Sequence, residues 1–293
     1  MSALAQQLAL LRRQAGERPA AVPTSTRSPL PEELRRLLGI RERATGSAPA
    51  LRAVARDRDL PGLEIAEGLR LVERHYHADV TQALLQVDAV VSRREAPLGE
   101  IDSGRILHFD TETTGLAGGT GTRAFMVGAA DWRDGGLRVR QLLCTQLRAE
   151  RAMLECFASW LAPDSVLSSY NGRCYDAPLL AARYRLSRLP NPLTGLRHLD
   201  LLFPVRRRFR GVWENCRLAT VERRWLGIVR EDDLPGSEAP RAWIDYLRGG
   251  DARDLRRVLA HNDQDLRTLG GLMLRLLEPE SLPEHPRSVD TFA

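Results

Sequence analysis

The sequence predicts an α/β fold in which a mixed five-stranded sheet is flanked by helices. Short apolar runs at residues 105–109, 124–130 and 137–145 have the length of buried strands. Strand and helix patterns then alternate between residues 150 and 201, and the helical period dominates from residue 217 onward. Strands that meander first and then alternate with helices are typical of a mixed sheet covered by helices.

Two further strands are expected at residues 165–169 and 197–201. The tetrapeptide Arg133-Asp134-Gly135-Gly136 separates the runs 124–130 and 137–145, and Asp-Gly is a favoured two-residue hairpin turn. These two runs should therefore pair as antiparallel neighbours in the sheet.

The helical segments carry apolar residues at intervals of three and four. In the longest, residues 252–277, leucine, valine and methionine recur at this spacing, Asp251 is a suitable N-cap and Pro279 follows the end. We expect further helices at residues 150–161, 177–186, 217–226 and 238–248.

The chain divides unevenly along its length. Residues 1–50 contain two short helical patterns, and the segments between and after them are polar, the first of them rich in Pro, Ser and Thr. This part of the chain should form a flexible, poorly structured N-terminal tail. Residues 51–103 carry weak strand signals and should form a small segment that packs on the core. The main domain is expected at residues 104–280, followed by a C-terminal tail at residues 281–293.

All 43 basic residues are arginine, because the chain contains no lysine. This absence excludes a Gly-Lys-Ser/Thr phosphate loop, a lysine Schiff base, a Ser-x-x-Lys acylase and a protein kinase. The net charge of +5 and the pI near 9.4 are compatible with a polyanionic partner. A GC-rich genome, which encodes arginine in place of lysine, explains the excess of arginine equally well.

The four cysteines contain no Cys-x-x-Cys pair, so neither a zinc site nor a disulfide framework is expected. The apolar runs fall well short of the ~18 residues that a membrane helix needs. Near the N-terminus, apolar residues precede Arg12 and Arg13, the reverse of the order in a secretory signal. We expect a reduced, cytoplasmic protein that does not associate with membranes.

The first motif is Ile-Leu-His-Phe-Asp-Thr-Glu-Thr-Thr-Gly-Leu (106–116), a buried strand that ends in two acids. Asp110 and Glu112 are two residues apart, so their side chains share a face of the strand. Buried neighbouring carboxylates cost several kcal/mol each unless cations compensate their charge, and Mg²⁺ or Mn²⁺ suits such oxygen ligands. The alternative is that Asp110 caps a turn and Glu112 is solvated.

Two more acids follow in shorter motifs. In Tyr-Asn-Gly-Arg-Cys-Tyr-Asp-Ala-Pro-Leu-Leu (170–180), Asp176 stands at the start of a helix, where it either binds a cation or acts as an N-cap. In His-Asn-Asp-Gln-Asp-Leu (261–266), His261 and Asp265 are four residues apart and share a helix face. A histidine beside a metal-binding acid has the properties of a general base. An ordinary His–Asp pair within the helix is the alternative.

With these motifs in this order, the sequence resembles the DEDD exonucleases of the RNase H-like superfamily, the DnaQ-like group. It is most similar to the YprB-like family, which is related to the exonuclease domains of B-family DNA polymerases. The resemblance covers about residues 104–277. It rests on residues 109–116 with Gly-Gly-Thr-Gly-Thr (118–122), on 170–180, on His-Leu-Asp-Leu-Leu (198–202) and on 261–266.

The resemblance implies a metal-dependent 3′–5′ exonuclease that hydrolyses phosphodiester bonds of single-stranded DNA or RNA. In the family, two divalent cations about 4 Å apart activate the attacking water and stabilise the leaving 3′-oxygen. The acid at the position of Asp110 bridges both ions, and His261 would take the proton of the water. The ligands of the two ions, Mg²⁺ or Mn²⁺, would be Asp110, Glu112, Asp176 and Asp265.

One spacing departs from the family. Its histidine subgroup places base and acid five residues apart and its tyrosine subgroup four, whereas His261 and Asp265 are four apart. The metal role of Asp265 is therefore better supported than the base role of His261. Asp263 is an alternative candidate for the metal ligand in this motif. It stands two residues from Asp265 in the same helix, however, so its side chain points to a different face.

Family analogy also places the terminal nucleotide against the first two motifs. Leu116 would pack on its base, while Asn171 and Tyr175 would line the same cleft, with turn and core roles as the alternative. The contacts from the first motif would be Thr113, Thr114, Gly115 and Leu116.

A basic segment lies between the second and third motifs. Residues 204–230 contain eight arginines and two acids, a net charge of +6. Phe209, Trp213 and Trp225 are interleaved with them. Arginines pair with phosphates and aromatic rings stack on unpaired bases, so this segment is expected to contact nucleic acid. The alternative is an amphipathic helix whose aromatic residues belong to the core. The candidate phosphate contacts are Arg206, Arg207, Arg208 and Arg210.

Two other functions stay open at this point. The first is an RNase H-fold endonuclease, which would cut a circular substrate that an exonuclease spares. The second is a nuclease-like scaffold that binds nucleic acid without cutting it. The presence of all four acids argues against the scaffold.

Overall fold

A computed structural model of the chain describes residues 56–77, 84–91, 99–115 and 121–278. The tails expected at residues 1–50 and 281–293 lie outside this part of the chain. The boundaries expected for the domains therefore stay predictions.

The sheet is mixed, which confirms the α/β class, but within the described residues it has seven strands rather than the expected five. The five expected strands are adjacent, in the order β7-β6-β5-β8-β9. Their bounds are β5 (Ile106–Thr113), β6 (Ala124–Arg133), β7 (Gly136–Cys144), β8 (Val166–Ser169) and β9 (Arg197–Asp200).

The two additional strands come from the segment that precedes the expected main domain. β2 (Leu69–His77) pairs antiparallel with the whole length of β7, and β1 (Leu63–Ala66) pairs with β2 at the sheet edge. A small separate sheet is formed by β3 (Leu84–Gln86) and β4 (Glu100–Asp102). The number five was wrong because strand formation depends on packing against distant neighbours, which leaves little local signal.

Strand direction brings the carboxyl ends of three strands to one edge of the sheet. β5 is antiparallel to β6 and parallel to β8, and β8 is parallel to β9. The hairpin between β6 and β7 is confirmed, with φ values of 51° at Asp134 and 74° at Gly135 that suit a two-residue turn. The acids at the end of β5 therefore lie on the same edge as the loop that follows β8.

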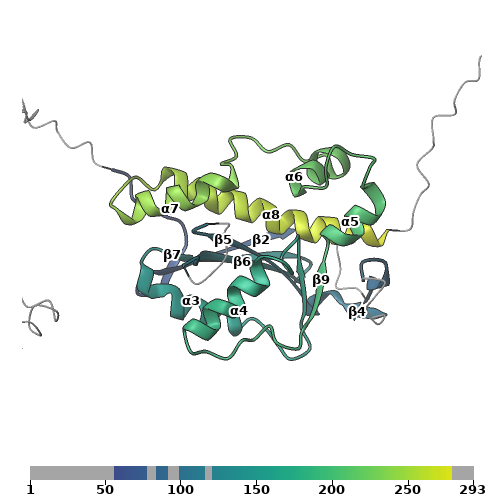
Figure 1. Cartoon of the computed structure of the whole chain (residues 1–293), viewed down its shortest axis with the longest axis horizontal. Coiled ribbons are helices and arrows are strands. Elements are labelled where there is room, and N and C mark those ends of the chain that lie inside the picture. Colours follow the sequence, from purple (N-terminus) through teal and green to yellow (C-terminus); the bar gives the residue numbers. More distant parts are fainter. Residues whose placement is uncertain (1–55, 78–83, 92–98, 116–120, 279–293) are drawn as a thin grey trace, which may run out of the picture. The chain divides into compact units, whose positions relative to one another are not determined.

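Helices cover both faces of the sheet (Figure 1). α3 (Glu150–Ala158) and α4 (Asp176–Leu186) cover one face, while α8 (Arg253–Leu277) runs along the other with α7 (Ala239–Leu247) beside it. No helix in the described ranges is long and apolar enough to cross a membrane. The remaining helices are α5 (Leu202–Phe209), which the sequence pattern did not indicate, and α6 (Leu218–Val221) with the π-helical turn Glu222–Leu226. Short 3-10 turns occur at Val87–Ala89, Ser103–Arg105, Leu147–Ala149 and Gly236–Glu238.

The apolar residues of α8 form two stretches with a polar stretch between them. Leu255 and Leu259 belong to a buried cluster with α7, and Leu266 and Met273 belong to a second cluster against the sheet. Residues 261–265 separate the two clusters. The helical spacing of the apolar residues thus docks α8 on the sheet and holds the polar motif over its central strands.

His108, on β5, makes the fold sensitive to pH. It is fully buried, and neither ring nitrogen has a hydrogen-bond partner among the described residues. Burial lowers its pKa from 6.5 to about 4, partly offset by the charge of Asp131. The unfolded chain thus takes up a proton at a higher pH than the folded chain, so the contribution of His108 to stability is lost as the pH falls from about 6.5 to about 4.

We expect His108→Leu to remove this dependence in metal-free protein. Between about pH 7.5 and about pH 5, the free energy of unfolding of the variant relative to the wild type should rise by on the order of 1–2 kcal/mol. Urea denaturation at the two pH values measures this change. A difference between the two proteins that does not vary with pH would contradict the role of His108.

Candidate metal-dependent site

Asp110 and Glu112 lie at the carboxyl end of β5, beneath α8. Asn262 of α8 donates from Nδ2 to Asp110 Oδ2 at 2.8 Å. Glu112 is only 7% exposed, so the alternative of a solvated glutamate is wrong. The strand period produces this arrangement, because Ile106 is buried on the same face as the two acids that follow it.

Asp176 is the first residue of α4, and the N-cap position is held by Tyr175. The Asp176 carboxylate accepts a short hydrogen bond from Thr111 Oγ1, which ties α4 to β5. Gly172 leaves room for this carboxylate, since a Cβ there would stand 2.5 Å from Ser169 Oγ and 3.1 Å from Asp176 Oδ2. The loop between β8 and α4 therefore brings the second motif to the first.

Asp200, at the end of β9, holds the loop that precedes Asp176. Its Oδ1 accepts from the backbone N–H groups of Asn171 at 2.7 Å and Leu202 at 3.1 Å. Its Oδ2 accepts from the backbone N–H of Arg173 at 3.2 Å. These bonds satisfy loop donors and the start of α5, so Asp200 caps backbone groups.

His261 and Asp265 share one face of α8, with Nε2 of the histidine 3.6 Å from Oδ2 of the aspartate. The other ring nitrogen, Nδ1, is 2.6 Å from Oδ1 of Asp233, which lies between the π-helical turn and α7. Asp263 points elsewhere and accepts a hydrogen bond from the Tyr76 hydroxyl at 2.7 Å. Its side chain therefore points to a different helix face from His261 and Asp265, as the spacing predicts.

Arg230 places a positive charge beside these acids. It donates to both oxygens of Glu222, from Nε at 2.7 Å and from Nη2 at 2.6 Å, and Nη2 also donates to Asp265 Oδ1. Glu222 is 1% exposed and also accepts from Thr268 of α8. Although Arg230 belongs to the basic segment, its guanidinium thus pairs with buried carboxylates.

The four motif acids are close enough to influence one another electrostatically. Burial raises the pKa of Asp110 well above its usual range, and the charges of Asp265, Asp176 and Glu112 raise it further. Burial also raises the pKa of Glu112 well above its usual range, and the charges of Asp265 and Asp176 raise it further. Burial also raises the pKa of Asp265, and that of Asp176 to about 6. A cation would relieve this repulsion.

The donor set fits a hard divalent cation, because it consists of carboxylate oxygens alone. Within the described residues, however, no three His, Cys, Asp or Glu side chains converge on a ready-made metal position. Three of the four acids instead accept hydrogen bonds from neighbouring side chains. Asp110 accepts from Asn262, Asp176 from Thr111, and Asp265 from Arg230.

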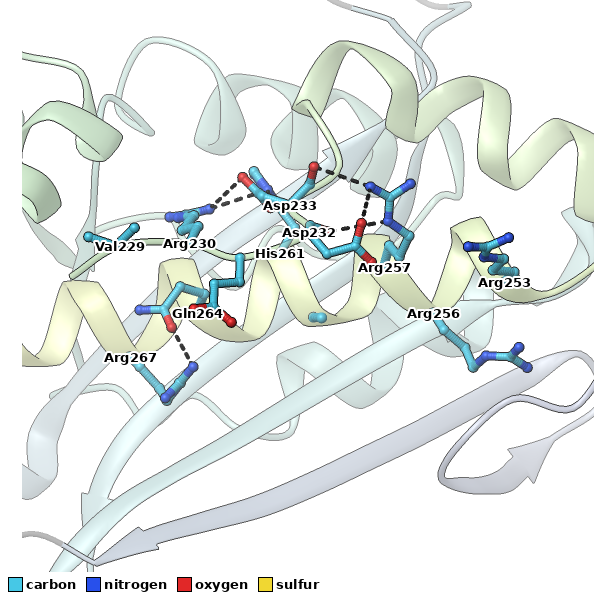
Figure 2. A pocket seen from close by; sticks show the side chains of 12 residues that line it. Val229, Arg230, Asp232, Asp233, Arg253, Arg256, Arg257, His261, Gln264 and Arg267 are labelled. Carbon is cyan, nitrogen blue, oxygen red and sulfur yellow. Dashed lines mark hydrogen bonds and ion pairs between the residues drawn. The ribbon is translucent and has the colours of Figure 1, made fainter.

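A basic pocket of about 470 Å³ opens on the outer side of His261 (Figure 2). Asp233 and Arg230 border it together with four arginines of α8, namely Arg253, Arg256, Arg257 and Arg267. Of the motif residues predicted to be catalytic, His261 lines this pocket and the four acids do not. The pocket therefore adjoins the acids through the histidine.

The residues predicted to contact the terminal nucleotide differ in their solvent exposure and backbone conformation. Thr113 and Thr114 are half-buried, and Thr114 pairs with Arg123 through both its backbone N–H and its Oγ1. Asn171 adopts a left-handed backbone with a φ of 67°, and Tyr175 is 59% exposed. Gly115 is half-buried, and Leu116 lies outside the described residues.

The aromatic residues of the basic segment are partly buried and pack against the core. The rings of Phe209 and Trp213 stack at a centroid distance of 3.7 Å, and both pack with Trp225 against a buried cluster. This packing fits the alternative in which the rings support the core, and a role of these rings in binding bases stays a prediction. Local sequence does not distinguish partly buried aromatic residues from an exposed stacking surface.

The predicted arginines of this segment are mostly exposed. Arg206, Arg207 and Arg210 are exposed, whereas Arg208 is half-buried and lies over the ring of Trp225 at 4.9 Å. The hydroxyl of Tyr170 donates to the carbonyl of Cys216 at 2.6 Å and so joins the segment to the end of β8. Arg206 and Arg210 line a cavity of about 320 Å³ in this region.

Four residues of the site had not been singled out from the sequence. Thr111 and Asn262 lie inside the motifs, and their place among the acids was an available signal. Arg230 and Asp233 lie outside the three acidic motifs, and tertiary packing alone brings them to α8. The motifs thus located the acids but not the groups that hold them.

Comparison with known proteins supports the resemblance to the RNase H-like superfamily. A family model described as the RNase H superfamily matches residues 107–277. The uncharacterized protein YprB of Bacillus subtilis (strain 168) is 34% identical over 177 residues, 60% of this chain and 42% of that protein. The chain therefore spans about two fifths of the length of this curated relative. The family B DNA polymerase of the hyperthermophilic archaeon Pyrobaculum calidifontis is 18% identical, with a TM-score of 0.46 over 59% of this chain and 24% of the polymerase.

The family model spans more than half of the chain, from β5 to the end of α8. All four motif acids and His261 fall inside this range. The chain belongs to the RNase H superfamily.

Proposed function

We propose that the chain is a metal-dependent 3′–5′ exonuclease that hydrolyses phosphodiester bonds of single-stranded DNA or RNA. The observation that carries this proposal is the group of four interacting carboxylates on β5, α4 and α8, whose pKa values burial raises. Such a group is costly in a fold unless cations compensate it. An RNase H-like fold also suggests nuclease activity.

The proposed ligands of Mg²⁺ or Mn²⁺ are Asp110, Glu112, Asp176 and Asp265. When bound, two such ions would activate water and stabilise the leaving 3′-oxygen. Asp110 and Glu112 are carried by the central strand of the expected domain, while the other two acids are carried by helices on opposite faces. The fold thus supplies ligands from three directions.

His261 is the proposed proton acceptor. Its Nδ1 lies closer to Asp233, at 2.6 Å, than to Arg230, at 3.2 Å. The carboxylate favours the tautomer with a proton on Nδ1, which leaves Nε2 as the acceptor beside Asp265. Asp233 thereby supports a base role for a histidine at the unusual four-residue spacing.

Two surface features support a nucleic-acid substrate. The ring of Tyr175 is 59% exposed next to Asp176, where it can stack on an unpaired base. The exposed side chains of Arg206, Arg207 and Arg210 can contact phosphates, and Tyr170 joins their segment to the same end of the sheet.

The proposal is tested with 5′-labelled single-stranded DNA and RNA incubated with the full chain and Mg²⁺ or Mn²⁺. We expect a ladder of labelled products that shorten from the 3′ end, with a circular single strand left intact. Cleavage of the circle would indicate an endonuclease instead. Binding without hydrolysis in either metal would indicate a scaffold.

A further inference from the structure

Three aligned backbone positions cross the sheet beneath α8. Asp110 of β5 pairs with Gly128 of β6, and Gly128 pairs with Gln141 of β7. Asn262 of α8 lies directly over the glycine, where a Cβ would stand 2.2 Å from Asn262 Oδ1. The missing side chain at Gly128 gives Asn262 the room to reach both neighbouring strands.

Asn262 joins the two flanking residues by hydrogen bonds. Its Nδ2 donates to Asp110 Oδ2 at 2.8 Å, and its Oδ1 accepts from Gln141 Nε2 at 2.9 Å. Gln141 Nε2 also donates to the carbonyl of Leu259 at 2.8 Å. Asn262 and Gln141 are both fully buried, so these bonds are shielded from water and an unpaired group there is costly.

The direction of every bond in this row is determined by Arg74 of β2. Its Nη1 donates to Gln141 Oε1 at 3.2 Å, and a guanidinium has no acceptor atom. Gln141 must therefore present its NH₂ group to Asn262, which in turn presents its own NH₂ group to Asp110. A reversed Asn262 amide would set its oxygen against a carboxylate and its NH₂ against another NH₂.

We infer that Gln141 and Asn262 are positioning residues that fix the direction of the Asp110 carboxylate toward a divalent cation. Asn262 holds one oxygen of Asp110, and Gln141 holds Asn262 in the orientation that makes this possible. This inference rests on the proposed function, because it takes Asp110 as a metal ligand. Changes to such partners of a metal ligand typically cost about 10–100-fold in metal affinity or activity.

The inference is tested by calorimetric titration of Mn²⁺ into the full chain. Asn262→Leu, which keeps the side-chain volume, should weaken Mn²⁺ binding about 10–100-fold. Gln141→Met changes nothing that touches Asp110, yet it should weaken binding in the same direction. The double variant should bind no more weakly than Asn262→Leu, because Gln141 acts through Asn262.

Gly128→Ala offers an independent route to the same loss, since its methyl group would displace the Asn262 amide. Gln264→Leu is the matched control. It removes an amide from the same helix, but one that donates to Thr268 Oγ1 at 3.1 Å, and Mn²⁺ affinity should not change. Gly271→Ala controls for the glycine change, because a Cβ there meets no atom within 4 Å.

A purely structural role predicts a different result. It would lower the melting temperature of metal-free protein while the folded fraction binds Mn²⁺ normally. Positioning instead lowers Mn²⁺ affinity, and it lowers kcat for the labelled oligonucleotide with KM unchanged.

Wild-type Mn²⁺ affinity in both Asn262→Leu and Gln141→Met would overturn the inference, and so would additive losses in the double variant. If Asn262→Leu does not fold, Gln141→Met decides. If the wild type binds Mn²⁺ and cleaves, and the variants match it, the positioning inference fails while the proposed function stands. If the wild type neither binds nor cleaves, the proposed function fails with it.

Discussion

Replacing Asp110 with asparagine is expected to slow phosphodiester hydrolysis by at least about a thousandfold while stabilising the metal-free fold. Metal ions contribute several kcal/mol of transition-state stabilisation, and ~1.4 kcal/mol corresponds to tenfold in rate. Asparagine retains an oxygen for Asn262 but loses the charge that attracts a cation. Burial raises the pKa of Asp110, so its ionised form costs folding free energy at neutral pH, and asparagine should raise the melting temperature.

Single-turnover rates on a labelled oligonucleotide, together with melting curves in a chelator, measure the two effects. Asp263→Asn is the matched control, because Asp263 belongs to the same helical motif as Asp265 but bonds to Tyr76 and Arg74 and to none of the motif acids, and asparagine keeps an acceptor for both partners. Its hydrolysis rate should stay within a few-fold of the wild type. Undiminished hydrolysis by Asp110→Asn, or an equal loss in Asp263→Asn, would show that the acids are wrongly assigned.

Arg230→Met is expected to lower the free energy of unfolding by about 3–5 kcal/mol, the cost of leaving one partner of a buried ion pair alone. Glu222 is 1% exposed and receives two hydrogen bonds from Arg230. Asp265 loses the same partner, and methionine supplies neither charge nor donor. Urea denaturation of metal-free protein measures the loss as a lower midpoint.

The double variant Arg230→Met/Glu222→Gln should recover much of this loss, because no buried glutamate charge is then unpaired. Arg241→Met is the surface control, since Arg241 is 80% exposed and lies 3.6 Å from Asp245. It should change stability by less than about 1 kcal/mol. Similar midpoints for Arg230→Met and Arg241→Met would mean that the buried pair contributes no more than a surface pair.

Local periodicity was sufficient to predict the element that carries each motif acid. Asp110 and Glu112 lie two residues apart at the end of a buried strand, and Asp176 begins a helix. His261 and Asp265 are one helical turn apart, and their side chains meet at 3.6 Å. These relations hold within a single strand or helix, so short-range sequence patterns contain them.

Groups that depend on distant contacts were not predictable in this way. Gln141 precedes its partner Asn262 by 121 residues, and Arg230 precedes Asp265 by 35. No periodic pattern connects such pairs. The long pairing of β2 with β7 was not predictable for the same reason. Phe209 and Trp213 show a related limit, because a partly buried aromatic pair has the same local sequence as an exposed stacking surface.

The most direct test of the carboxylate site is calorimetric titration of Mn²⁺ into the wild type and Asp110→Asn at neutral pH. We expect saturable binding of two ions per chain to the wild type and at least tenfold weaker binding to the variant. Wild-type protein that shows no saturable binding, or a variant with an identical isotherm, would contradict the assignment of these acids to a metal-dependent nuclease site.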